Sequence, residues 1–109
     1  MGKLKNITPG EILQEEFLIP MGISQSQLAE DINIPQTRIE GIINNNQRIT
    51  ANTALRLSMY FGNSAKFWLG LQDDFDIENV NRKYIYKQIK NKNKVQTVYE
   101  QSIYDEVPA

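Results

Sequence analysis

The sequence predicts an all-α protein of five or six helices, and three observations support that fold class. Residues 24–43 have the pattern of two short amphipathic helices joined by a tight turn. Residue types that start and stop helices recur before, within and after this pair. Helical apolar spacing continues into residues 67–75, so we expect a core built from packed helices.

The first predicted helix runs from Pro9 to Ile19. Thr8 suits the N-cap position, and Pro9 suits the first helical position because the N–H that proline lacks is not needed there. Glu11 stands three residues after Thr8 and completes a capping box. Local residues therefore define the start of this helix.

The second predicted helix begins at Ser24, which forms a capping box with Gln27. Ala29 is small enough for the following helix to cross closely at this position. Asn33 is placed to end the helix, because asparagine tolerates the left-handed conformation that a helix stop requires. The chain is therefore expected to turn at Asn33.

The third predicted helix starts at Gln36, because Pro35 fixes the backbone dihedral just before it. Its apolar face comprises Ile39, Ile42 and Ile43, and its polar face comprises Gln36, Thr37, Glu40 and Asn44. The second and third helices together form a helix-turn-helix, a motif whose second helix enters the major groove of DNA. The sequence therefore points to DNA binding.

Two further helices are predicted after the motif. Thr50 is expected to cap one that ends at Gly62, and Ser64 is expected to start the other. The latter carries an apolar stripe formed by Phe67, Trp68, Leu71 and Phe75. We interpret this stripe first as packing into the core of the same chain, and the alternative is that these four residues form a dimer interface.

The predicted domain boundary lies after Phe75. Residues 1–75 are expected to form the helix-turn-helix DNA-binding domain, and residues 76–109 a C-terminal extension. Asp76 is a candidate cap for a helix through Val80, Tyr84, Ile85 and Ile89. The lysines Lys87, Lys90, Lys92 and Lys94 belong to a solvated helix end, or they contact DNA phosphates or a protein partner. Residues 95–107 are consistent with an extra strand, a disordered tail or a partner-binding segment.

The composition removes most enzyme chemistry. The 109 residues include no cysteine and no histidine, which excludes disulfides, the common zinc sites and histidine-based catalysis. We therefore expect a protein that is not an enzyme and that needs no metal and no cofactor. No apolar run approaches the roughly 18 residues of a membrane span, and the start MGKLKN lacks a hydrophobic signal region. These features predict a cytoplasmic location.

The candidate DNA contacts lie on and around the third helix. Gln36 has the amide geometry that pairs with adenine, and Thr37 has a methyl group for thymine or a hydroxyl for a phosphate. Glu40 either accepts a hydrogen bond from a cytosine amino group or disfavours binding of the helix in a wrong register on the DNA. The predicted backbone contacts are Arg38, Asn44, Asn46 and Arg48. Because the net charge is only −1, DNA binding would depend on such local positive charge.

Three segments of the chain resemble a known family. The helix-turn-helix resembles the Xre/Cro type, while TPGEIL before it and RITANTALRLSMYFGNSAKFWLGLQ after it are similar to the HigA antitoxin family, also called virulence-associated protein I. The resemblance covers Ile7 to Phe75. Gly41 and Pro35 depart from the family pattern, and Gly41 would remove one possible base contact.

The resemblance implies a lambda-repressor-like domain that acts as a homodimer on a palindromic operator. It also implies that Gln25 anchors a DNA phosphate, and that the protein represses its own operon. The implied protein partner is a HigB-type toxin, an RNase of the RelE-like fold, which this protein would neutralise. The alternatives are a stand-alone Xre-type transcriptional regulator without a toxin, and a protein-interaction module that has lost DNA binding.

Overall fold

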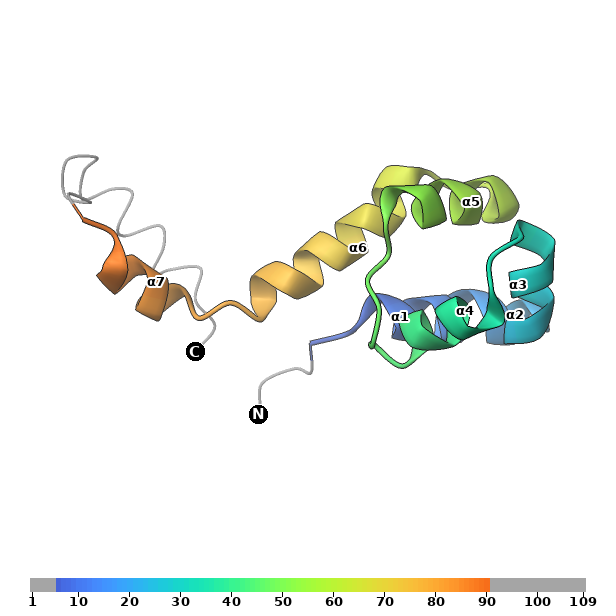
Figure 1. Cartoon of the computed structure of the whole chain (residues 1–109), viewed down its shortest axis with the longest axis horizontal. Helices are drawn as coiled ribbons and strands as arrows, with labels where there is room; N and C mark the ends of the chain where they lie inside the picture. Colours follow the sequence, from blue (N-terminus) through green and yellow to red (C-terminus); the bar gives the residue numbers. More distant parts are fainter. Residues whose placement is uncertain (1–5, 91–109) are drawn as a thin grey trace. The chain divides into compact units, whose positions relative to one another are not determined.

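The computed structural model describes residues 6–90, and every regular element among them is a helix (Figure 1). These residues form six continuous helical segments and contain no strand, which confirms the predicted all-α fold class. Residues 6–78 form one compact unit, and residues 79–90 belong to a second unit. None of the described helices is long and apolar enough to cross a membrane.

The first segment is one continuous helical stretch with an unusual middle. It comprises α1 (Pro9–Ile12), a π-helical part (Leu13–Leu18) and α2 (Ile19–Met21). Thr8 makes both predicted capping-box hydrogen bonds with Glu11, each 3.0 Å long. In the wider π-helical turn, the Ile19 N–H donates a hydrogen bond to the Gln14 carbonyl. The next residue, Pro20, has no N–H to donate to a helical hydrogen bond. The stretch therefore continues to Met21, two residues beyond the predicted end.

Helices α3 (Gln25–Ile32) and α4 (Gln36–Ile43) form the predicted helix-turn-helix. The Ser24 hydroxyl accepts from the Gln27 backbone N–H at 3.0 Å, as predicted. The Gln27 side chain instead donates to Asp31 at 2.7 Å, so the expected reciprocal half of the capping box is wrong. Asn33 adopts the left-handed conformation with φ 57°, which confirms it as the helix stop.

Helix α1 lies directly against α4 because of Gly10. A Cβ atom at Gly10 would lie 2.0 Å from the Ile42 carbonyl oxygen and 2.8 Å from the Ile43 Cα atom. Only a residue without a side chain allows this approach. Ala29, the small residue expected at the helix crossing, is buried as predicted, whereas Gly10 was not identified from the sequence.

Helices α5 (Ala51–Phe61) and α6 (Ala65–Glu78) complete the compact unit. Gly62 ends α5 with φ 80°, as predicted. Trp68 on α6 is fully buried in the core beside Phe17 and Phe61, with ring centroids 4.9 Å and 6.0 Å away. Its indole N–H donates to the Asn63 side-chain oxygen at 2.8 Å.

The predicted stripe on α6 is therefore divided between two environments. Trp68 has no exposed surface for a partner, so it serves the core, as the first interpretation of this stripe expects. Leu71 packs partly against the same core, and Phe75 is half-buried. Phe67 is 40% exposed and retains surface for an intermolecular contact.

The expected cap at Asp76 is wrong. Asp76 lies within α6, which continues to Glu78 and so runs through the predicted boundary at Phe75. The next helix, α7 (Arg82–Gln88), is capped by Asn81, whose side-chain oxygen accepts from the Tyr84 N–H at 2.9 Å. The predictions for Lys92, Lys94 and residues 95–107 lie outside the described residues.

Candidate nucleic-acid interface

The first turn of α4 is presented to solvent. Gln36, Thr37 and Arg38 are all exposed, while Ile39 and Ile42 on the opposite face are fully buried in the core. Pro35 precedes the helix with φ −55° and ψ 139°, an extended conformation that separates α4 from α3. The sequence pattern therefore places three polar side chains where a DNA groove can reach them, and their roles remain predictions.

The Gln36 amide has a defined orientation. Its Nε2 atom donates to Glu40 Oε2 at 3.0 Å, one helical turn along α4. Bidentate pairing with adenine uses the amide oxygen and one N–H. Since Nε2 carries two hydrogens, Gln36 can keep the Glu40 bond and still present both groups. Glu40 is thus placed to hold the amide of Gln36, a role that neither sequence interpretation of Glu40 included.

The segment after α4 folds back over the helix end. Asn45 takes a left-handed conformation with φ 62°, and the N–H groups of Asn46 and Gln47 donate to the Gly41 carbonyl at 2.7 Å and 3.0 Å. Asn44 and Asn46 are exposed along this turn. Gly41 itself is buried, and a Cβ atom there would lie 2.8 Å from the Gln47 side chain. A side chain at position 41 would therefore first displace that of Gln47, and the interpretation of Gly41 as a lost base contact stays a prediction.

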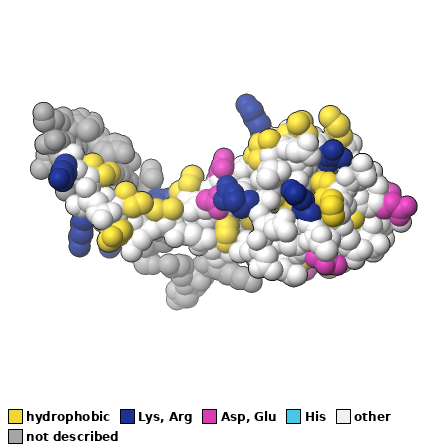
Figure 2. All heavy atoms as spheres, viewed as in Figure 1, with side chains coloured by type: hydrophobic (Ala, Val, Ile, Leu, Met, Phe, Trp, Pro, Cys, Tyr) yellow, Lys and Arg dark blue, Asp and Glu magenta, His cyan; other side chains and the backbone are white. Residues whose placement is uncertain are grey.

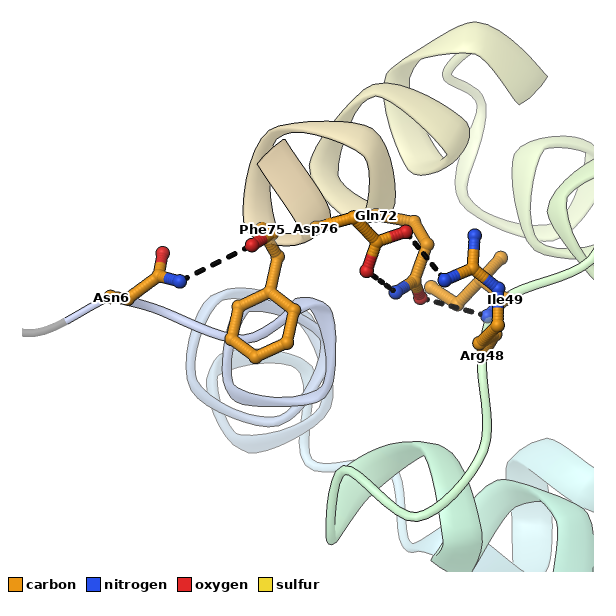
Figure 3. A network of polar contacts seen from close by, with 6 residues as sticks. All are labelled: Asn6, Arg48, Ile49, Gln72, Phe75 and Asp76. Atoms are coloured by element: carbon orange, nitrogen blue, oxygen red, sulfur yellow. Dashed lines mark hydrogen bonds and ion pairs between the residues drawn. The ribbon is translucent and has the colours of Figure 1, made fainter. Parts of the chain in front are cut away.

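Arg48 takes part in a polar network that joins the loop after α4 to α6 (Figure 3). It pairs with Asp76 at 2.5 Å, and its side chain is 64% exposed. On the neighbouring residue, the Ile49 N–H donates to the Gln72 side-chain oxygen at 3.0 Å. Gln72 in turn donates to Asp76 at 3.1 Å. Arg48 is therefore held near the end of α4, with most of its side chain accessible to a phosphate.

The network also affects the ionisation of Asp76. The hydrogen bond from Arg48 holds the pKa of the Asp76 carboxyl below its usual value, and the hydrogen bond from Gln72 and the Arg48 charge act in the same direction. Partial burial of the Asp76 carboxyl acts in the opposite direction and raises its pKa. At the other side of α6, the Asn6 side chain donates to the Phe75 carbonyl at 3.3 Å. These contacts fix α6 relative to the helix-turn-helix.

The predicted phosphate anchor Gln25 lies in the first turn of α3 and is partly exposed. Its own backbone N–H belongs to the helix start that Ser24 caps through the Gln27 N–H. Helix starts carry outward-facing amide groups and a partial positive charge. A position in the first turn of α3 suits a phosphate contact, and this role of Gln25 remains a prediction.

Sequence reasoning missed Arg56 on α5. Its Nη1 atom donates to the Ile32 carbonyl at 2.8 Å and to the Asn33 carbonyl at 3.4 Å, and its Nε atom donates to Asn52 at 2.8 Å. These carbonyls end α3 and lack helical partners. Arg56 therefore supports the turn between the two motif helices, and no local pattern could identify acceptors that lie 23 or 24 residues away.

A second tie between α5 and α3 was also unpredicted. The Tyr60 hydroxyl donates to the Asp31 carboxylate at 2.6 Å. This hydrogen bond, together with desolvation and the negative charge of Asp31, raises the pKa of Tyr60. Arg56 and Tyr60 lie four residues apart on α5 and contact the last turn of α3. Helix α5 therefore holds α3 at two points.

Charge is not gathered into one patch on the face drawn in Figure 2. Basic side chains there are separated by hydrophobic and acidic ones over the part of the molecule that carries α1–α6. This face therefore offers no broad positive surface to nucleic acid. Backbone contacts would have to come from individually placed arginines.

Comparison with known proteins places this arrangement in a family. Residues 14–68 match the Helix-turn-helix family. Virulence-associated protein I from Dichelobacter nodosus is 47% identical over 72 residues, which cover 66% of this chain and 67% of that protein. The matched residues include the whole of α3 and α4.

Solved structures agree with the sequence comparison. The Pseudomonas aeruginosa antitoxin HigA with higBA promoter is 34% identical with a TM-score of 0.75, over 81% of this chain and 99% of that one. An addiction module antidote protein of a HigA family from Coxiella burnetii is 42% identical with a TM-score of 0.74, over 80% and 98% of the two chains. This chain therefore belongs to the HigA antitoxin and virulence-associated protein I family of Xre-type helix-turn-helix proteins.

Proposed function

We propose that this protein is a sequence-specific transcriptional repressor that binds operator DNA through α4 and neutralises a toxin encoded beside it. The observation that supports this proposal most directly is the exposed first turn of α4, with Gln36 and Thr37 at its surface. The relative from Pseudomonas aeruginosa is a HigA antitoxin solved with the higBA promoter, which supports both parts of the proposal.

In this proposal Gln36 and Thr37 read base edges in the major groove. Arg38, Asn44, Asn46 and Arg48 contact the DNA backbone on one side of α4, and Gln25 contacts it on the other side. Glu40 orients the Gln36 amide through their 3.0 Å hydrogen bond. Phosphate contacts fix the register of the domain on DNA, and base contacts supply the selectivity.

The proposal includes a homodimer on a palindromic operator, because one short helix reads only a half-site. Phe67, at 40% exposed, is the member of the α6 stripe with most surface available for such an interface, and Leu71 and Phe75 follow it about one and two helical turns along α6. Residues 1–75 would then form the DNA-binding domain and residues 76–109 an extension. Light scattering at micromolar concentration tests this point, and a strict monomer with and without DNA contradicts it.

The toxin would bind outside α4, because a repressing complex must contact toxin and DNA together. The acidic outer side of the first helical stretch is one candidate surface, since Glu15 and Glu16 are exposed there and a basic RNase would be attracted to them. The segment after Asn91 is the other candidate and lies outside the described residues.

Two measurements test the proposed function. Gel-shift titration against the DNA upstream of the gene is expected to show tighter binding than to a scrambled duplex at the same salt concentration. Co-expression with the neighbouring reading frame is expected to rescue growth. Selective DNA binding without rescue would instead support a stand-alone regulator, and absence of selective binding would contradict the repressor.

A further inference from the structure

A hollow of about 330 Å³ lies between the turn that joins α3 to α4 and the first turns of α5. Its lining includes Arg38 from α4 and Asn52 and Arg56 from α5, with Pro35 between the two motif helices. None of the side chains that line it is acidic. This Arg38/Arg56 hollow therefore concentrates positive charge in a chain whose net charge is −1.

The Arg56 guanidinium is oriented but its charge is not neutralised. Its two bonded nitrogens donate to neutral acceptors, namely the backbone carbonyls of Ile32 and Asn33 and the side-chain amide of Asn52. Its Nη2 atom makes no hydrogen bond with the described residues. An arginine fixed at one side and open at the other presents a directed donor to an anion.

We propose that the Arg38/Arg56 hollow is a seat for one DNA backbone phosphate, which Arg38 and Arg56 contact together and Asn52 helps to position. The inference rests on the proposed function, since Pro35 and Arg38 line the hollow at the start of α4, where α4 would enter the major groove. A phosphate of the bound duplex is the anion that this location favours, because phosphates flank a recognition helix in the groove.

The seat would couple the two kinds of DNA contact. Arg56 binds the phosphate while its Nη1 atom holds the carbonyls of Ile32 and Asn33, at the end of α3. The position of this phosphate is then fixed relative to the turn that sets the direction of α4. A wrong phosphate position would displace Gln36 from its base, so Arg56 contributes to register as well as to affinity.

The Asn52→Asp variant tests the seat without removing either arginine. An aspartate keeps an oxygen that accepts from Arg56 Nε, and a negative charge in the first turn of α5 favours the helix. It also offsets one of the two positive charges that line the hollow. We expect an unchanged or higher melting temperature, and roughly ten-fold weaker binding to the operator and to a scrambled duplex alike.

Asn63→Asp is the matched control. Asn63 also uses its side-chain oxygen to accept an N–H, from Trp68 at 2.8 Å, and it lies beyond the other end of α5. The length of α5 is about 16 Å, more than the screening length of about 10 Å at 0.1 M salt. We therefore expect Asn63→Asp to bind DNA as the wild type does.

Arginine variants measure the phosphate contact itself. The double variant Arg38→Gln/Arg56→Gln should lower the slope of log affinity against log salt by about 0.9, because it removes both contacts to one phosphate, and Arg56→Gln alone should lower it by less. Arg56→Lys keeps the charge and should keep the slope. Lys66→Gln, an exposed charge on α6, is the control for net charge and should keep the slope. The double variant Arg38→Gln/Arg56→Gln should lose less affinity than the product of the single losses, because both arginines share one phosphate.

The outcomes separate the seat from the proposed function. If the wild type binds DNA and Asn52→Asp and Arg56→Gln leave affinity and slope unchanged, the seat is wrong and the repressor stands. Fully independent losses in the double variant also contradict a shared phosphate. If the wild type binds neither operator nor scrambled duplex at low salt, the seat and the repressor are both overturned.

Discussion

The helix ends within the helix-turn-helix pair are set by local contacts, whereas the loop that follows the pair is held by distant ones. In α3 and the turn after it, the Ser24 cap acts over three residues and Asn33 acts through its own backbone conformation. In the loop, Ile49 binds Gln72 and Arg48 binds Asp76, 23 and 28 residues away. The difference shows that near neighbours form the motif, whereas distant parts of the chain set its position.

The largest expected effect comes from breaking one distant contact, the approach of α1 to α4. Gly10→Ala places a Cβ atom 2.0 Å from a backbone oxygen of Ile42, which cannot move aside as a side chain can. We expect a loss of at least about 3 kcal/mol in the free energy of unfolding, measured by denaturant titration.

Gly70→Ala is the matched substitution at a site with open space. A Cβ atom at Gly70 meets nothing within 4 Å, and the residue lies inside α6. Alanine is the better helix former there, so we expect a gain of about 0.5–1 kcal/mol. Equal effects of the two substitutions would show that helix propensity, and not the contact with α4, determines the cost at Gly10.

This contrast also explains which parts of the fold sequence reasoning could predict. The caps at Thr8, Ser24 and Thr50 and the stops at Asn33 and Gly62 act through residues next to the helix ends, and the structure confirms them. The roles of Gly10, Arg56 and Gln72 depend on partners that become neighbours only after folding. No local pattern identifies such partners.

The candidate site divides in the same way. The exposed positions of Gln36, Thr37 and Arg38 follow from the helical period of α4, so the sequence placed them correctly on the surface. The bond between Gln36 and Glu40 has helical spacing and was within reach of sequence reasoning. The fixed position of Arg48 was not, because it depends on Asp76, which was expected to cap a separate helix.

An intermediate effect is expected from the helix-turn-helix surface. Gln36→Ala and Thr37→Ala should each reduce operator selectivity by about 1–3 kcal/mol per base contact, with little change in binding to scrambled DNA. Arg38→Ala should weaken binding to both duplexes and lower its salt dependence. Gel-shift titrations at two salt concentrations distinguish these patterns.

Two variants of Glu40 test whether it orients the Gln36 amide. Glu40→Gln keeps an oxygen that accepts from Gln36 Nε2, whereas Glu40→Ala removes it. If Glu40 orients the Gln36 amide, only the alanine variant loses selectivity. A matched loss in both variants would instead assign a direct charged contact to Glu40.

The smallest expected effect concerns the link between Arg48 and Asp76. The folded state lowers the pKa of Asp76, chiefly through the hydrogen bond from Arg48. A lowered pKa means that the unfolded chain binds a proton more readily, so this contribution to stability is complete above the unfolded value of 3.8. It is lost as the pH falls through the folded value. Because the pair lies at the surface, the effect on the unfolding free energy should be modest.

Asp76→Asn tests this contribution. The variant should unfold more easily than the wild type at neutral pH, and the two curves should converge in acid, where Asp76 of the wild type is protonated as well. High salt should narrow the difference at neutral pH, because it screens an exposed ion pair. Asp74→Asn removes the same charge from an exposed position on the same helix and should not reproduce this convergence. A gap between Asp76→Asn and wild type that stays constant from neutral pH into acid would show that packing of α6 against the loop, and not the charge of Asp76, holds Arg48 in place.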